Sequence, residues 1–162
     1  MLRVVVAVTL SVALLTVTLP ALETARRDRS DRRVTAELDR LAAAIQDVYA
    51  REAAVSPDAT GAQRIVAVRI PTRSWTGAAV EYVAIGAHPE RAEVDERNET
   101  TFGWQVSGAR SRTRRLADVP VEAATPGDGD SPLVIREPGR HRLALSLVVR
   151  DGQRTVVVRR VD

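Results

Sequence analysis

The sequence predicts an α+β protein in three parts: a transmembrane anchor over residues 1–22, an amphipathic helix over residues 23–55 and a β-rich domain over residues 56–162. Three observations support this order. Residues 4–22 carry no charged side chain, and residues 24–54 contain neither glycine nor proline. Several later segments alternate apolar and polar residues, which is the period of a β-strand.

The uncharged run from Val4 to Leu22 has 19 residues. As a helix it extends about 28 Å, close to the thickness of the hydrocarbon core of a bilayer. A cleaved secretory signal is the first alternative, but cutting after Ala21 or Ala25 places Leu19 or Glu23 where a small residue is needed. A core helix of a soluble protein is the second, and the length of the run disfavours it. We therefore expect a retained single-pass anchor in contact with membrane lipid.

Two signals in the sequence give opposite predictions for the side of the membrane on which the residues after the anchor lie. The arginines after residue 25 place them in the cytoplasm if the positive-inside rule is applied literally. The β-rich remainder and the sequon Asn98-Glu99-Thr100 suit the exterior, where Asn98 would be a candidate N-glycosylation site. We expect the chain in the cell membrane with its β-rich domain outside.

Pro20 lies late in the apolar run. Proline removes one backbone donor and bends a helix, and such a bend is tolerated in a membrane helix. The sequence therefore predicts a kink at Pro20, where the anchor leaves the bilayer.

The amphipathic helix carries an apolar seam with a spacing of 4, 3, 4 and 3 residues, which is typical of helix packing. Its members are Val34, Leu38, Leu41, Ile45 and Val48. The seam is expected to pack on the chain's own β-domain or, alternatively, partly against other subunits. Residues 26–33 are charged at every position but Ser30, and we expect them to be solvated or to lie at the lipid headgroups. Pairs such as Arg27–Asp31 and Asp47–Arg51 are spaced to support the helix.

The remainder predicts five to seven strands in meander order, mostly antiparallel because the connections are short. The segments QRIVAVRIP, AAVEYVAIG and TFGWQVSG alternate in this way. Asp151-Gly152 predicts a two-residue hairpin turn, preceded by a strand with Leu143, Leu145, Leu147 and Val149 on one face. Residues 87–98 and 123–131 are expected to be loops.

Composition argues against several classes of function. The chain has no cysteine and only 3% aromatic residues, which disfavours a base-stacking surface for nucleic acid. A net charge of +3 does not imply a polyanionic partner. His88 and His141 lack the spacing of a metal pair, and Asp128-Gly129-Asp130 lacks the rest of a calcium loop. We expect no enzyme activity, no cofactor or metal, and neither nucleic acid nor a small-molecule substrate as a partner.

Four arginines alternate in the segment ARSRTRRL and would line one face of a strand. They are Arg110, Arg112, Arg114 and Arg115. Such a row is suited to phosphate or an acidic glycan, and it equally fits an edge strand that is protected by charge.

An apolar helix with a proline near its end, then an amphipathic helix and a β-meander, resembles type IV pilin-like proteins and the pseudopilins of type II secretion systems. The resemblance implies that VVVAVTLSVALLTVTLPALE is the membrane-resident, filament-core half of a long helix with Pro20 at its bend. The lysine-free sequence, with GAQRIVAVRIPTRSW after the helix, is also similar to a small uncharacterised haloarchaeal family associated with pilus or secretion loci. In contrast to prepilins, only Met1-Leu2-Arg3 precedes the apolar run, and the run lacks an acidic residue.

The resemblance implies a non-enzymatic, membrane-anchored component of a pilus or of a type II or type IV secretion assembly, with other pilin-like subunits as partners. The alternative is a membrane-tethered immunoglobulin-like β-sandwich used for adhesion or ligand binding. That alternative comes from EPGRHRLALSLVVRDGQRTVVV, which is similar to the last two strands of such a sandwich.

Overall fold

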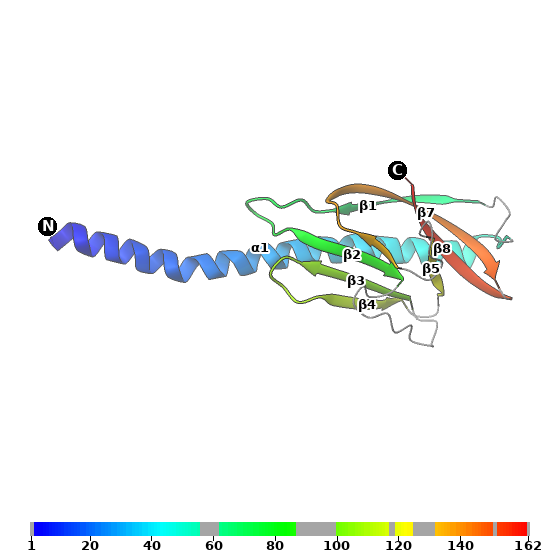
Figure 1. The fold of residues 1–162 in the computed structure, drawn as a ribbon, viewed down its shortest axis with the longest axis horizontal. Coiled ribbons are helices and arrows are strands. Elements are labelled where there is room, and N and C mark those ends of the chain that lie inside the picture. Colours follow the sequence, from blue (N-terminus) through cyan, green and yellow to red (C-terminus); the bar gives the residue numbers. More distant parts are fainter. Residues whose placement is uncertain are drawn as a thin grey trace.

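The computed structural model describes residues 2–55, 62–86, 100–116, 119–124, 132–150 and 152–161. Over these residues the chain forms one long helix followed by eight strands (Figure 1). The helix is α1, Leu2–Arg51. The strands are β1 (Arg64–Ile70), β2 (Val80–Gly86), β3 (Thr100–Val106), β4 (Arg112–Leu116), β5 (Val121–Ala123), β6 (Leu133–Ile135), β7 (Gly139–Arg150) and β8 (Gln153–Val161).

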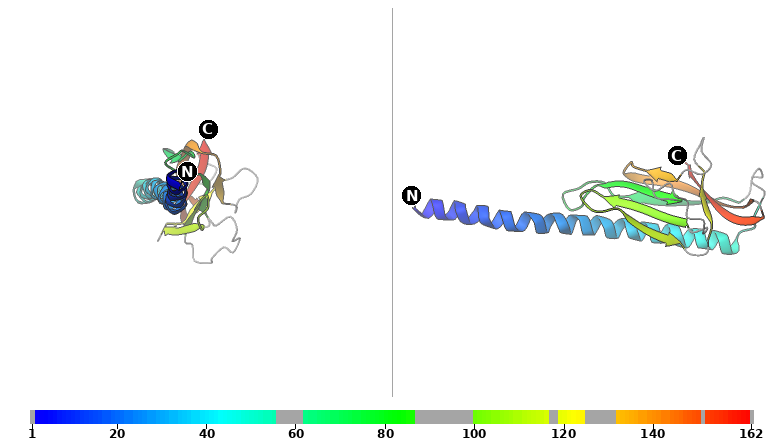
Figure 2. Two further views of the ribbon diagram at one scale, coloured as in Figure 1. Left: turned by 90° about the vertical axis from the view of Figure 1, so that its left-hand side faces the viewer. Right: turned by 60° about the horizontal axis from the view of Figure 1, so that its bottom comes forward.

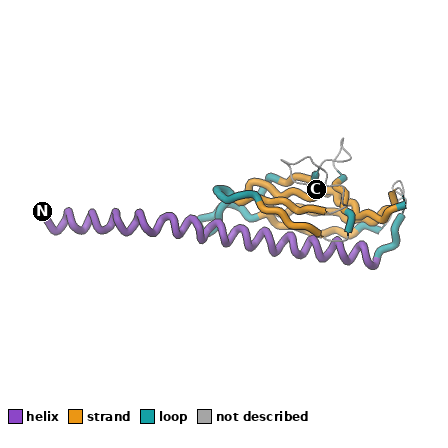
Figure 3. Tube along the Cα trace, turned by 90° about the horizontal axis from the view of Figure 1, so that it is seen from below, coloured by secondary structure: helices purple, strands orange, loops and turns teal. Residues whose placement is uncertain are grey.

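The predicted anchor and the predicted amphipathic helix form one continuous helix of 50 residues (Figure 3). It ends at Arg51, whereas the sequence predicted an end at residue 55. The chain leaves the helix because Val55 pairs with β7: its N–H donates to the carbonyl of Leu147 at 3.2 Å, and its own carbonyl accepts from Val149 N–H at 3.0 Å. The first half of α1 projects beyond the strands, and the second half runs along them (Figure 1).

The strands form two four-stranded sheets, with the orders β1-β7-β8-β5 and β4-β3-β2-β6. The α+β class and the dominance of antiparallel pairs are confirmed. The meander order is wrong, since β1 pairs with the distant β7, β2 pairs with β6, and β5 is parallel to β8. Alternation within a segment predicts a strand and its inward face, but it contains no information about which distant strand becomes the neighbour.

The β7–β8 hairpin confirms the predicted two-residue turn, because Arg150 pairs with Gln153 across it. Gly152 has a φ of 79°, in the left-handed region that glycine adopts without strain. Leu143, Leu145 and Leu147 are buried as predicted. Val149 is 38% exposed and Val148 is buried instead, since the segment around Val55 runs alongside this end of the strand.

One hydrophobic core joins the two sheets and the second half of α1. Viewed along its axis, α1 lies at one side of the strands (Figure 2), where it contacts β1, β3, β7 and β8. Strand β2 is central in its sheet and is buried on both faces, with Tyr82, Val83, Ala84 and Ile85 all nearly inaccessible. The helix is therefore a layer of the domain as well as an extension from it.

Candidate functional site

The first half of α1 has apolar side chains exposed on every side. Its large members from Val4 to Leu22 that the structure describes are all roughly half or more exposed, with Leu10 the most exposed at 72%. Polar side chains in this half are satisfied within the helix: the hydroxyl of Thr9 donates to the carbonyl of Val5 at 2.8 Å, and that of Ser11 to the carbonyl of Ala7 at 2.9 Å. This is the back-bonding that lets hydroxyls enter an apolar environment.

By length and composition, this half of α1 is able to cross a membrane. Its surface is the observation on which the candidate function depends, since apolar side chains on all sides are typical of a helix surrounded by lipid or by other apolar helices.

Pro20 lies inside α1, which continues as a helix on both sides of it. Its carbonyl accepts the hydroxyl of Thr24 at 3.0 Å, one turn later. The kink at this position stays a prediction, with the missing backbone donor of proline as its physical basis.

The second half of α1 buries the predicted seam against the chain's own strands. The five seam side chains are 0–2% exposed and belong to the common core; they are Val34, Leu38, Leu41, Ile45 and Val48. These residues leave almost no surface for a neighbouring subunit. Of the two partners considered for the seam, the domain of the same chain occupies it.

The charged turns at residues 26–33 are less solvated than expected, because one face of them contacts the strands. Ser30 is 1% exposed, and its hydroxyl donates to the carbonyl of Ala78 at 2.9 Å. The carboxylate of Asp31 accepts from Trp104 Nε1 at 2.9 Å and pairs with Arg112 at 2.9 Å. The predicted pairing of Asp31 with Arg27 is wrong: Arg27 pairs with Glu23 at 3.3 Å.

A signal for this contact is present in the sequence. Ser30 is the one uncharged residue between positions 26 and 33, and it is the one that is fully buried. Here the one small uncharged residue in the charged row lies where the backbone of Ala78 approaches the helix. The hydrogen bond from Trp104 to Asp31 has no such signal, because it joins residues 73 positions apart.

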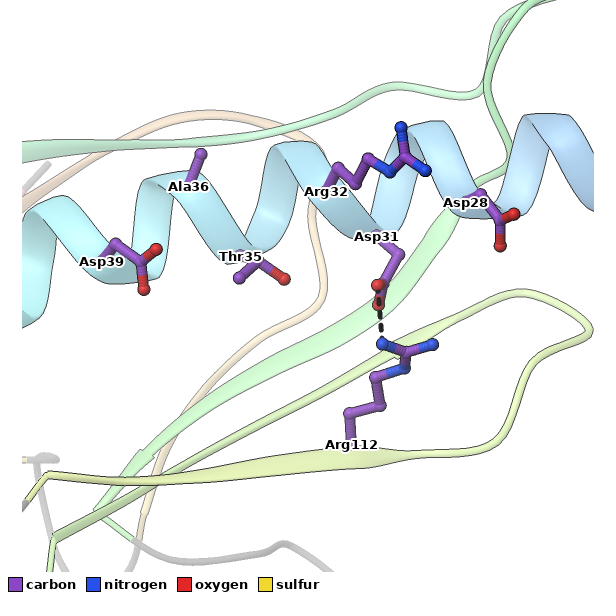
Figure 4. A pocket seen from close by; sticks show the side chains of 7 residues that line it. All are labelled: Asp28, Asp31, Arg32, Thr35, Ala36, Asp39 and Arg112. Atoms are coloured by element: carbon purple, nitrogen blue, oxygen red, sulfur yellow. Dashed lines mark ion pairs between the residues drawn. The ribbon is translucent and has the colours of Figure 1, made fainter.

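Arginines from both flanking strands hold the acidic side chains of α1. From β4, Arg112 pairs with Asp31 (Figure 4) and Arg114 pairs with Asp39. From β1, Arg64 pairs with Asp47, which also pairs within the helix with Arg51 at 3.0 Å, as predicted. The arginine row of β4 therefore includes two residues that bind the chain's own helix, and β4 is the edge strand that the second interpretation required.

An open cleft of about 500 Å³ lies between α1 and β4. Figure 4 shows its side chains, which are Asp28, Asp31, Arg32, Thr35, Ala36, Asp39 and Arg112. Asp31 and Asp39 pair with arginines of β4, so these two charges are largely compensated. Within the described part of the chain, no three histidine or acidic side chains lie close enough together to hold a metal ion.

His141 is buried, and its Nε2 lies 2.8 Å from the carbonyl oxygen of Glu137. The side chain of Glu137 accepts from Arg160 at 2.9 Å, and this guanidinium holds the pKa of Glu137 below its usual value. The imidazole thus has a structural partner. His88, Asn98 and Asp128-Gly129-Asp130 lie outside the described residues.

The fold therefore defines a class: an α+β chain in which one long helix is apolar enough to cross a membrane at one end and is built into a β-domain at the other. The chain belongs to the family described as Domain of unknown function (DUF7311), whose model matches residues 1–161. Comparison with curated proteins and with solved structures finds no match.

Proposed function

We propose that this chain is a non-enzymatic, pilin-like subunit of a pilus or of a type II or type IV secretion assembly. One observation carries the proposal: residues 4–22 are apolar and exposed on all sides, and the same helix continues without a break into the core of the β-domain. In this arrangement, a continuous helix joins the anchor to the displayed domain.

The proposed mechanism is side-by-side packing of exposed helix halves within the membrane. Residues 4–22 cross the cell membrane once, and the β-domain is displayed outside the cell. Contact between subunits falls on residues 4–22, because the seam from Val34 to Val48 is already buried within each chain. Helices associate in lipid through close packing and hydrogen bonds rather than through the hydrophobic effect.

Disulfide crosslinking in native membranes tests this proposal, and the absence of natural cysteine makes the result unambiguous. We expect Leu10→Cys to give a disulfide-linked dimer under mild oxidation, because the one cysteine of each chain can form one disulfide. Val149→Cys is the matched control: it is also an exposed apolar position, but it lies in the β7–β8 hairpin. Monomers alone from Leu10→Cys, in membranes that contain the chain, would contradict assembly.

The second candidate is a membrane-tethered immunoglobulin-like sandwich for adhesion or ligand binding. It is favoured by the two four-stranded sheets that share one core. It requires a β-domain that is stable without α1, and expression of residues 60–162 alone tests that requirement. We expect an insoluble product, because removal of the helix uncovers the apolar side chains of both sheets. A soluble, folded fragment that binds a ligand would favour the sandwich.

A further inference from the structure

The connection between β1 and β2 displays a tryptophan on a tight turn. The side chain of Trp75 is 83% exposed, more than any other large apolar side chain in the described part of the chain. It lies in the turn from Ser74 to Gly77, whose ends exchange two hydrogen bonds of 3.0 and 3.3 Å between backbone groups. The backbone that carries the indole is therefore part of a structured turn.

The turn is fixed to α1 at a defined position along the helix axis. Ala78 N–H donates to the carbonyl of Arg26 at 3.4 Å, and the carbonyl of Ala78 accepts the hydroxyl of Ser30 at 2.9 Å. Gly77 packs so closely on Ser30 that an added Cβ would lie 3.1 Å from its hydroxyl oxygen. These contacts link the position of Trp75 to the position of the anchor.

When residues 4–22 lie in a membrane, this position along the helix axis corresponds to the lipid headgroup layer. Arg26 follows Leu22 by four residues, which is about 6 Å along a helix. The headgroup layer on each side of the hydrocarbon core is about 5–7 Å thick. In agreement with this estimate, the β1–β2 connection lies at the end of the domain from which the exposed half of α1 projects (Figure 1).

Basic side chains lie at this level and in the two helical turns beyond it. Residues 23–33 contain five arginines against three acidic residues, and Arg73 lies directly before the turn. Arg29, Arg33 and Arg73 are exposed. Tryptophan is enriched at membrane interfaces, and arginine near a membrane is attracted to anionic lipid. The two residue types therefore favour the same partner.

We propose that the turn of Trp75, together with the neighbouring arginines, is a second membrane contact that docks on lipid headgroups of anionic character. The inference rests on the proposed anchor at residues 4–22. A single helix in a bilayer leaves the whole chain free to tilt and to rotate about the helix axis. A second contact to one side of the helix fixes which face of the β-domain points away from the membrane.

Quenching of tryptophan fluorescence by brominated lipid tests the docking in the full chain, reconstituted in vesicles of phosphatidylcholine and phosphatidylglycerol. The chain has two tryptophans, and Trp104 is buried in the core. With bromine on the acyl carbons nearest the headgroup, we expect emission to fall about twofold, since one of the two indoles lies at the interface. Bromine near the bilayer centre should quench less.

Three variants test the origin of the signal. Trp75→Phe should remove the quenching and leave the emission of Trp104, which also reports that the domain is folded. Val149→Trp in the Trp75→Phe background is the matched control, because it places an exposed indole in the β7–β8 hairpin, at the opposite end of the domain (Figure 1). This control should show no quenching. Arg29→Gln with Arg73→Gln, both at exposed positions, should reduce the quenching gained when phosphatidylglycerol is added.

Flotation of the vesicles separates the two proposals. A chain that floats with the vesicles while Trp75 stays unquenched retains the anchor and overturns the docking. A chain that does not float overturns the anchor, and the docking with it. A third outcome is that the emission of Trp75 shifts to the blue without quenching by brominated lipid, and that the shift reverts when the protein is diluted in the membrane. This would mean that a second copy of the chain covers the turn, and it would also overturn the lipid contact.

Discussion

The two halves of α1 share one helical backbone and differ in how their apolar side chains are distributed. In residues 4–22 these side chains point in all directions and are exposed. In residues 26–48 they form a single stripe among charged residues, and the stripe is buried. A β-domain covers one side of a helix, so it can bury a stripe and cannot bury a helix that is apolar all round. The more apolar half is therefore the one left outside the domain.

The same substitution in the two halves should have opposite consequences, and this is the largest effect that we expect. Leu41→Arg places a charge without a partner in the core, at a cost comparable to the whole stability of a domain, about 5–15 kcal/mol. We expect the chain to lose its folded domain, seen as complete digestion by trypsin. Assembly should be lost with it.

Leu14→Arg is the matched variant. A charged residue at the centre of a membrane helix costs about 2.5–3.5 kcal/mol of insertion free energy. We expect a trypsin-resistant domain of normal size that no longer fractionates with membranes. An intact, fully assembled Leu41→Arg protein would contradict the described core, and a Leu14→Arg protein that unfolds would contradict the separation of the two halves.

Truncation of the same two leucines gives a smaller, graded version of the comparison. The side chain of Leu41 is 0% exposed, so Leu41→Ala leaves a cavity in the core. This should lower the free energy of unfolding by about 2–5 kcal/mol. Leu14→Ala, at an exposed position, should change it by less than about 0.5 kcal/mol in detergent. Chemical denaturation of the purified proteins measures both values. Equal losses at the two positions would mean that residue 14 also contacts the domain.

The contrast between the halves was available from sequence because periodicity and charge are local properties. The seam, the strand segments and the β7–β8 turn follow from residues that are close together in the chain. The sheet order does not, since β1 with β7 and β2 with β6 are pairs of distant segments. The end of α1 at Arg51 depends on the pairing of Val55 with β7. The burial of Ser30 depends on its contact with Ala78, which is distant in the sequence.

Ser30 is the first buried residue of the second half of α1, and removal of its hydroxyl tests how firmly the domain holds the helix there. Ser30→Ala leaves the carbonyl of Ala78 without its 2.9 Å hydrogen bond, which should cost about 1 kcal/mol of unfolding free energy. Thr24→Ala is the matched control, since that exposed hydroxyl donates only within the helix, to the carbonyl of Pro20. We expect a change near zero for the control. A neutral Ser30→Ala would mean that apolar packing alone positions this turn.

The smallest expected effect comes from the ion pairs that flank the buried half. Arg114 on β4 pairs with Asp39 on α1, and both side chains are about half exposed, so a double-mutant cycle with Arg114→Gln and Asp39→Asn should give a coupling of about 0.2–1 kcal/mol. The cycle on Arg27 and Glu23, a pair within the helix, should give about 0.3–0.5 kcal/mol. Added salt should weaken both couplings because it screens exposed charges. A coupling between Arg114 and Asp39 that survives high salt would show that β4 shields this pair from solvent. The ion pair would then hold the second half of α1 in place together with its apolar stripe.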